Sequence, residues 1–211
     1  MNIEKSKLLL YAITDRSCLK GKSLEEAVEE AILGGVTCVQ LREKNVSDEE
    51  VLEEAQKLLK VCHKYNVPLI INDDYNVALK SGADGVHVGI EDAPVAEIRR
   101  IAGEKFIIGA TAKTVEQARL AESSGADYLG VGAVFTSPTK INAIRITPQQ
   151  LKEICTCVNI PAVAIGGITA ENVYDIKGCG HSGIAVVSAV FGAYDSKSAA
   201  EQLCRAVRDT I

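Results

Sequence analysis

Short apolar runs alternate with amphipathic segments along the whole chain, and this alternation restricts the folds that the chain can adopt. Eight runs rich in Val, Ile and Leu are separated by stretches in which apolar residues recur at helical spacing. Strands that are apolar on both faces and are joined by helices are typical of parallel sheets. The predicted strands cover residues 8–15, 38–43, 68–73, 85–89, 106–111, 128–132, 161–167 and 184–188.

The joints between the repeating units favour a closed barrel over an open doubly wound sheet. Several of them, such as SGADGVHVG and SGADYLGVG, end a helix with glycine and begin a strand within a few residues. Polar residues or glycines follow nearly every predicted strand, whereas an open sheet gathers them at one switch point. We therefore expect the α/β class and a (β/α)₈ TIM barrel, forming a single domain over residues 1–211.

Composition excludes some classes of function. The chain has 23 Lys and Arg against 28 Asp and Glu, with no basic block, so nucleic-acid binding is not expected. The N-terminus has only a short apolar run followed by charges, which predicts a cytoplasmic protein without a membrane partner. The seven scattered cysteines indicate reduced, mostly buried thiols rather than a zinc site.

The segment QLREK at the end of the second predicted strand carries two cations. Alternation along a strand would place Gln40, Arg42 and Lys44 on one face at the barrel mouth, with Leu41 toward the helices. An anion such as a phosphate would compensate both cations, and arginine binds phosphate through two parallel hydrogen bonds. The alternative is an internal salt bridge to Glu43 or to another carboxylate.

Carboxylates follow the next two strands. Adjacent strand ends lie about 5 Å apart, so Asp73 and Asp92 can approach one point, where they repel each other unless a cation joins them. Magnesium is bound by one or two carboxylates together with phosphate and water oxygens, which fits this pair. The alternative is that these acids cap the following helices, a role that suits Asp74 better than Asp73.

Two further segments point to phosphate. Gly166 and Gly167 follow the seventh strand beside Ser188, the usual phosphate position of such barrels, although a tight turn without a ligand is the alternative. The loop after the sixth strand, with its hydroxyls and Lys140, suggests a flap over anions or a solvated connection. His87 lies within a strand and suits an orienting role better than a catalytic one.

The ordered set QLREK, INDD, GVHVGIED, GATAKT, AIGGI and VVS resembles the thiamine phosphate synthase family, from Tyr11 to about Phe191. The resemblance implies a transferase that joins hydroxymethylpyrimidine diphosphate to thiazole phosphate and releases diphosphate. It further implies Mg²⁺ as cofactor and a dissociative substitution. We expect these two small molecules as partners, and the sequence is compatible with a monomer or a homo-oligomer.

Site residues follow from the same resemblance, position by position. The pyrimidine diphosphate would be bound by Gln40, Leu41, Arg42, Glu43, Lys44, Asn72, Thr111 and Lys140. Among these, Arg42, Lys44 and Lys140 would act in catalysis by stabilising charge on the leaving group. Magnesium would be bound by Asp73 and Asp92. The thiazole phosphate would be bound by Ser137, Pro138, Thr139, Gly167, Val187 and Ser188. The chain departs from the family pattern at Thr111, Lys113, Ala133, Ser137 and Asn142.

Two other functions are open to a barrel of this kind. A related thiazole tautomerase isomerises the thiazole partner without a metal, but relatives of that type lose the NDD run that is intact here at residues 72–74. A non-catalytic phosphate-binding barrel would bind thiazole phosphate and release no diphosphate. Sensitivity to EDTA and release of diphosphate distinguish these alternatives.

Overall fold

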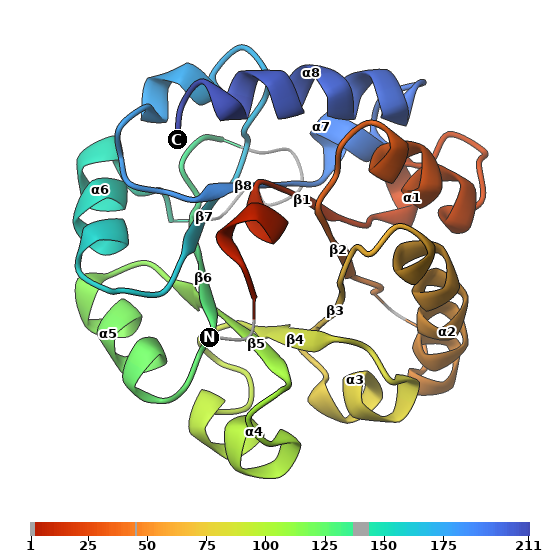
Figure 1. The fold of residues 1–211 in the computed structure, drawn as a ribbon, viewed down its shortest axis with the longest axis horizontal. Helices are drawn as coiled ribbons and strands as arrows, with labels where there is room; N and C mark the ends of the chain where they lie inside the picture. Colours follow the sequence, from red (N-terminus) through yellow and green to blue (C-terminus); the bar gives the residue numbers. More distant parts are fainter. Residues whose placement is uncertain (1–2, 45, 137–143) are drawn as a thin grey trace.

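The fold is a closed barrel of eight parallel strands, as predicted (Figure 1). The computed structural model describes residues 3–44, 46–136 and 144–211. Each strand pairs with the next one along the chain, and the last pairs with the first. The strands are β1 (Leu10–Ile13), β2 (Cys38–Leu41), β3 (Leu69–Asn72), β4 (Gly85–Val88), β5 (Ile107–Ala112), β6 (Tyr128–Gly132), β7 (Ala162–Ile165) and β8 (Gly183–Val186).

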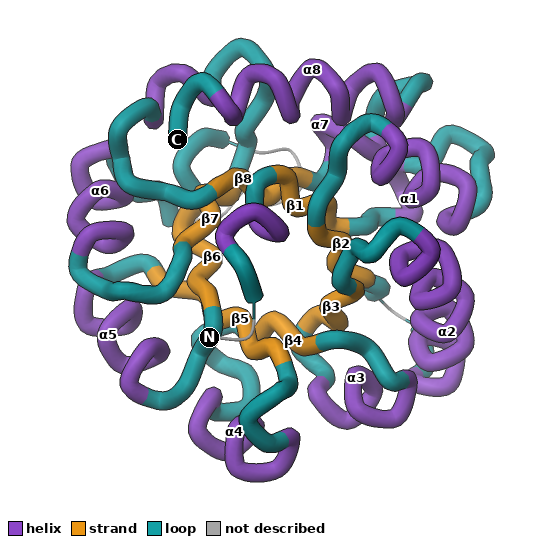
Figure 2. Tube along the Cα trace, viewed as in Figure 1, coloured by secondary structure: helices purple, strands orange, loops and turns teal. Residues whose placement is uncertain are grey.

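Helices surround this ring of strands (Figure 2). They are α1 (Leu24–Leu33), α2 (Asp48–Lys64), α3 (Tyr75–Ser81), α4 (Val95–Ala102), α5 (Val115–Ser123), α6 (Pro148–Thr156), α7 (Ser188–Phe191) and α8 (Ser196–Arg208). The connection from β7 to β8 contains a 3₁₀ turn, η3 (Val173–Ile176), in place of a full helix. Both α7 and α8 follow β8, so the short α7 is an extra element at the end of the last strand.

Local sequence explains where several helices begin. Ser23, Ser47 and Thr147 each accept a hydrogen bond from the third residue of the helix that follows, whose side chain bonds back to the cap. The capping box predicted for Ser47 and Glu50 is therefore confirmed. These reciprocal bonds satisfy amide groups that have no partner inside the helix.

Six of the eight strands are shorter than the apolar runs that predicted them, and β5 and β6 have the predicted length. The run 161–167 yields a strand that ends at Ile165, because Gly166 and Gly167 have φ angles of +104° and +64°. Such angles belong to turns, and glycine adopts them without steric cost. The run 38–43 likewise ends at Leu41, so Arg42 and Glu43 belong to a loop.

Apolar side chains form two layers. One fills the barrel and includes Tyr11, Ile70 and Tyr128, while the larger one lies between strands and helices. The N-terminal 3₁₀ turn η1 (Lys5–Leu8) lies over one end of the barrel (Figure 1). Leu8 joins the interior layer there. This end is therefore closed by the chain itself, and the opposite end, at the carboxyl ends of the strands, is left for a site.

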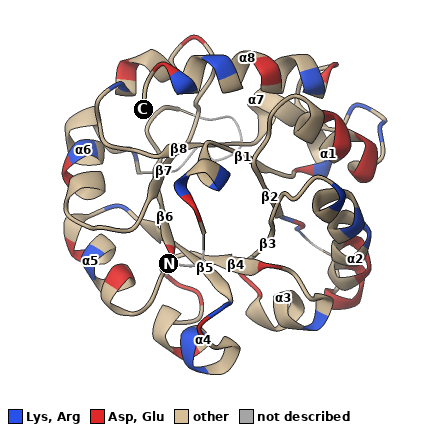
Figure 3. Cartoon of the chain, in the orientation of Figure 1, with Lys and Arg blue, Asp and Glu red and all other residues tan. Residues whose placement is uncertain are grey.

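Charged side chains lie mainly on the outer helices and the loops (Figure 3). All seven cysteines are free thiols, and five of them are buried, as predicted. Burial raises the pKa of Cys62 and of Cys155 to about 12, so both stay protonated. Within the described ranges, no helix combines the length and the apolar character that crossing a membrane requires.

Candidate functional site

The end of β2 places Gln40 inside the barrel and Leu41 outside it, as alternation predicts. Gln40 is buried, and its Nε2 donates a hydrogen bond to the hydroxyl of Tyr11 at 2.7 Å. Leu41 belongs to the layer between strands and helices. The predicted strand extended to Glu43, whereas β2 ends at Leu41 and Arg42 and Lys44 lie in the loop that follows. That their side chains share the face of Gln40 stays a prediction.

A buried threonine holds that loop in place. The hydroxyl of Thr14 accepts a hydrogen bond from the amide of Arg42 at 2.9 Å, and the amide of Thr14 donates to the carbonyl of Gln40 at 2.9 Å. Thr14 thus ties the end of β1 to both residues that flank Leu41. Its position at the end of a predicted strand was visible in the sequence, but its supporting role was not.

Glu43 forms an ion pair with Arg16, which sequence reasoning missed. Arg16 Nε lies 2.8 Å from Glu43 Oε1. Burial raises the pKa of Glu43, and the charge of Arg16 opposes that rise. Arg42 and Lys44 make no ion pair with another residue in the described part of the chain. The salt bridge considered for this segment therefore involves Arg16, which leaves the other two cations suited to an anionic ligand.

Asp73 has an unusual backbone conformation at the end of β3. Its φ angle is +64°, in the left-handed region that aspartate enters more readily than most residues. Two bonds hold it there: its amide donates to the carbonyl of His87 at 2.8 Å, and Asn72 Nδ2 donates to Asp73 Oδ2 at 2.5 Å. Residues held in such conformations by their surroundings are concentrated at functional sites.

The three acids near these strand ends have different local roles. Asp74 Oδ1 accepts hydrogen bonds from the amides of Asn76 and Val77 at 2.8 and 3.0 Å, so it caps α3 as predicted. Asp92 Oδ2 accepts from the amide of Gly89 at 2.6 Å and closes the turn after β4. It does not cap α4, whose N-cap is Pro94. Asp73 and Asp92 thus follow neighbouring strands without serving as helix caps.

A chain of polar side chains crosses the barrel interior below these residues. The hydroxyls of Tyr11 and Tyr128 lie 2.8 Å apart, and the hydroxyl of Tyr128 lies 3.1 Å from His87 Nδ1. His87 Nε2 lies 3.1 Å from Thr111 Oγ1. His87 is thus enclosed between a tyrosine and a threonine, which fits the orienting role expected for it. The chain links Gln40 to Thr111, two residues expected to bind the pyrimidine diphosphate.

The loops after β6 and β7 meet at the second predicted subsite. The amide of Phe135 donates to the carbonyl of Gly166 at 2.9 Å, and Asn172 Nδ2 donates to the carbonyl of Gly167 at 2.9 Å. A side chain at Gly167 would come within 2.2 Å of the carbonyl oxygen of Thr136, so this close approach requires glycine. Four residues assigned to this loop, Ser137, Pro138, Thr139 and Lys140, lie outside the described residues.

Val187 and Ser188 do not belong to the last strand, contrary to the prediction. β8 ends at Val186, Val187 is the N-cap of α7, and Ser188 is the first residue of that short helix. The first amide groups of a helix have no partner within it, and they point toward whatever lies beyond the helix start. Phosphate sites in such barrels commonly combine the loops after the seventh and eighth strands with the start of a short extra helix.

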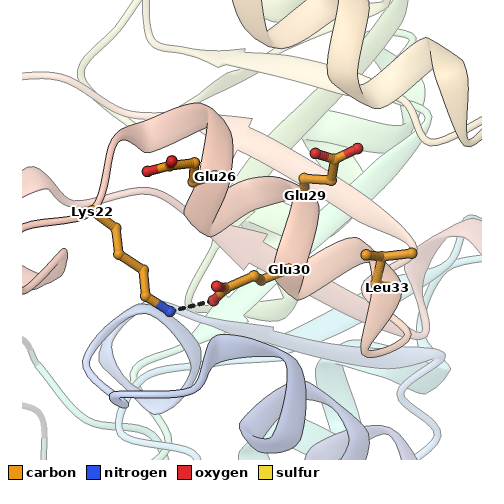
Figure 4. A pocket seen from close by; sticks show the side chains of 5 residues that line it. All are labelled: Lys22, Glu26, Glu29, Glu30 and Leu33. Atoms are coloured by element: carbon orange, nitrogen blue, oxygen red, sulfur yellow. Dashed lines mark hydrogen bonds and ion pairs between the residues drawn. The ribbon is translucent and has the colours of Figure 1, made fainter.

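A hollow on α1 lies outside the barrel and is not part of this site (Figure 4). Its charged groups already have partners: Lys22 Nζ lies 2.5 Å from Glu30 Oε2, and Lys64 Nζ lies 2.8 Å from Glu29 Oε1. Glu26 belongs to the capping box of α1. These contacts explain the acidic residues as helix-surface structure.

A sequence profile described as "TMP-TENI: Thiamine monophosphate synthase" matches residues 10–190. Thiamine-phosphate synthase from Clostridium tetani is 50% identical over 194 residues, which cover 92% of this chain and 93% of that protein. The protein of the same name from Caldanaerobacter subterraneus is 51% identical over 186 residues, which cover 88% and 86%.

A solved structure extends the comparison to three dimensions. Thiamine phosphate pyrophosphorylase from Pyrococcus furiosus matches with a TM-score of 0.90 and 40% identity, and the match covers 98% of each chain. Both the sequence and the fold therefore match thiamine-phosphate synthases over almost the whole length of the chain. This protein is a transferase, and the chain belongs to the thiamine monophosphate synthase family.

Proposed function

We propose that this enzyme joins hydroxymethylpyrimidine diphosphate to thiazole phosphate, forming thiamine phosphate and releasing diphosphate. The observation that carries the proposal is the position of Asp73 and Asp92 after neighbouring strands, beside a strand that leads into Arg42 and Lys44. Paired carboxylates with adjacent cations suit a ligand that is bound through both a divalent metal and direct contacts to phosphate.

The donor set at the ends of β3 and β4 fits Mg²⁺. Asp73 and Asp92 each use Oδ2 in a local hydrogen bond, and a carboxylate has enough lone pairs to bind a metal as well. No group of three or more His, Cys, Asp or Glu within the described ranges is suited to hold a metal. Two carboxylates completed by phosphate and water oxygens are the usual arrangement for magnesium. When bound there, the ion would offset negative charge on the diphosphate.

The side chains supply electrostatic stabilisation rather than acid or base catalysis. In a dissociative substitution the C–O bond to diphosphate breaks first, and both bonding electrons leave with the diphosphate. Arg42, Lys44 and Lys140 would stabilise the charge that develops on it. The thiazole nitrogen then forms the new C–N bond with its lone pair, so no proton has to be removed. This account agrees with the position of His87 between Tyr128 and Thr111.

The second subsite would hold the thiazole phosphate. Gly167 and the start of α7 at Ser188 present backbone amides, and amides at a helix start favour a phosphate group. The predicted contacts from Ser137, Pro138, Thr139 and Val187 would complete this subsite. Binding here would bring the thiazole ring next to the pyrimidine site across the barrel mouth.

The test is incubation of the purified protein with both phosphorylated heterocycles, with Mg²⁺ or with excess EDTA. We expect thiamine phosphate and diphosphate in equal amounts, and no product with EDTA. Isomerisation of the thiazole that continues in EDTA would instead identify a tautomerase. Binding of thiazole phosphate without release of diphosphate would identify a non-catalytic barrel.

A further inference from the structure

We propose that a hydrogen-bond chain of fixed direction inside the barrel makes His87 a positioning residue, which orients the hydroxyl of Thr111 as a donor to the bound ligand. The identity of that ligand, the pyrimidine diphosphate, rests on the function proposed above. The direction of the chain follows from the side chains themselves and does not depend on the ligand.

Five side chains from five strands form the chain. Gln40 Nε2 lies 2.7 Å from the Tyr11 hydroxyl, which lies 2.8 Å from the Tyr128 hydroxyl. The Tyr128 hydroxyl lies 3.1 Å from His87 Nδ1, and His87 Nε2 lies 3.1 Å from Thr111 Oγ1. All four distances fall within the range of normal hydrogen bonds.

The first bond has a fixed direction, and the cost of leaving a buried hydroxyl proton without an acceptor extends that direction along the proposed chain. An amide nitrogen can only donate, so Tyr11 accepts from Gln40 and uses its own proton to donate to Tyr128. In the proposed chain Tyr128 in turn donates to Nδ1 of His87, which is then the nitrogen without a proton. A neutral imidazole carries its single proton on the other nitrogen, so Nε2 donates to Thr111.

Burial keeps the tyrosines in the protonated form that this chain needs. Tyr11 and Tyr128 are almost fully buried, and burial raises the pKa of each phenol well above its usual value. Both hydroxyls therefore keep their protons at neutral pH. Neither can reverse the chain by losing its proton.

Two glycines on neighbouring strands leave room for the chain. A side chain at Gly109 on β5 would come within 2.1 Å of the Tyr128 ring, and one at Gly130 on β6 would come within 2.9 Å of the His87 ring. The interior of a barrel is normally filled by side chains from every strand. The polar chain is therefore a packed structural feature, in which these glycines are needed to accommodate the two rings.

The free end of the chain is the proton of Thr111. Its Oγ1 accepts from His87, and no other hydrogen bond of this hydroxyl is found in the part of the chain that the structure describes. A hydroxyl that has accepted one bond still has its proton to donate. At the mouth of the barrel this proton is available to an acceptor atom of the pyrimidine diphosphate.

The first test reads the proton on His87 directly. The protein has three histidines, so ¹⁵N-histidine labelling gives few signals. A His87→Gln variant identifies the signals of His87. We expect a protonated Nε2 and an unprotonated Nδ1 in the free protein. In Tyr128→Phe, which removes the donor to Nδ1, we expect the two nitrogen shifts to move toward each other. A protonated Nδ1 in the unsubstituted protein would overturn the proposal.

The second test measures binding by calorimetry, which does not require turnover. Thr111→Val should raise the Kd for pyrimidine diphosphate about tenfold or more, because a hydrogen bond to a charged group is lost, while Thr111→Ser should preserve it. Tyr128→Phe should raise the Kd several-fold. The control is Tyr65→Phe, which also loses a hydrogen bond, to Glu29 at 2.7 Å, but lies outside the barrel.

An unchanged Kd in Thr111→Val would overturn the proposal even if the enzyme makes thiamine phosphate. Conversely, a protein that shows the expected tautomer and the expected Kd changes but forms no product would contradict the proposed function alone.

Discussion

Arg16 Nε lies 2.8 Å from Glu43 Oε1, and Nη2 of the same guanidinium lies 3.0 Å from Glu54 Oε2. Both carboxylates are buried, with side chains 4% and 9% exposed, whereas the arginine is half exposed. One cation therefore holds the loop after β2 against α2. We infer that Arg16 positions the segment that carries Arg42 and Lys44.

Replacing Arg16 with alanine should weaken binding of the pyrimidine diphosphate. The variant leaves Glu43 without its cation and Glu54 with Lys57 alone, which should lower the free energy of unfolding by about 1 to 2 kcal/mol, a reduced value because the arginine is partly exposed. We expect KM for this substrate to rise about tenfold in a steady-state assay. Lys57→Ala is the matched control, because Lys57 also contacts Glu54, at 3.5 Å, but does not reach Glu43. Equal effects of the two substitutions would contradict the positioning role.

Gly167→Ala should destabilise the protein and weaken binding of thiazole phosphate. The new Cβ would lie 2.2 Å from the carbonyl oxygen of Thr136, and the backbone at this position is left-handed. We therefore expect urea unfolding to show a free energy of unfolding that is lower by about 2 to 4 kcal/mol. Gly178→Ala separates the two causes, because Gly178 has a φ of +76° with nothing within 4 Å of the added atom. If the free energy of unfolding decreases no more in Gly167→Ala than in Gly178→Ala, the close approach of Gly167 to Thr136 does not contribute.

His181 should make the folded protein sensitive to mild acid. It is buried, its Nδ1 has no hydrogen-bond partner within the described ranges, and burial lowers its pKa. Below a pH of about 6.5, His181 therefore binds a proton more readily in the unfolded chain than in the folded protein. The free energy of unfolding falls as the pH falls through this range. Urea unfolding measured at neutral and at mildly acidic pH should show that the free energy of unfolding decreases less in His181→Gln than in the unsubstituted protein. An identical decrease in both proteins would assign the sensitivity to other groups.

Arg42→Lys should lower kcat although it preserves the charge. Lysine cannot form the two parallel hydrogen bonds that a guanidinium makes with phosphate, so we expect a decrease of about tenfold or more. Lys140→Ala, at a position outside the described residues, should also lower kcat. Arg100→Ala removes an exposed arginine from α4 and serves as the control. Unchanged kcat in both test variants would reject the role of these cations.

The sequence was sufficient to predict the barrel and the acids at its mouth. The strand order follows from the alternation of apolar runs with helices, and the cap at Asp74 follows from its place before an amphipathic segment. The predicted ends of strands were less accurate. An apolar run can continue into glycines such as Gly166, where the backbone has already left the strand.

Contacts across the barrel could not be predicted in this way. Tyr11 and Tyr128 are 117 residues apart, and their hydrogen bond depends on the closure and register of the whole sheet. A partial signal existed in Gly109 and Gly130, because glycine within a strand often marks a close approach by another group. Arg16 carried no signal, since a half-exposed arginine after a strand is common on any protein surface.

The most direct test of the account is the magnesium dependence of product formation in Asp92→Asn. Asparagine preserves the acceptor for the amide of Gly89 and removes only the charge, so the turn after β4 should remain intact. The matched control is Asp74→Asn, because Asp74 lies next to Asp73 but caps α3, and asparagine is an equally good cap. We expect the Mg²⁺ concentration for half-maximal rate to rise at least about tenfold in Asp92→Asn and to stay unchanged in Asp74→Asn, since a carboxylate ligand of the metal is lost only in the former. The same magnesium dependence in Asp92→Asn as in the unsubstituted enzyme would contradict the central claim.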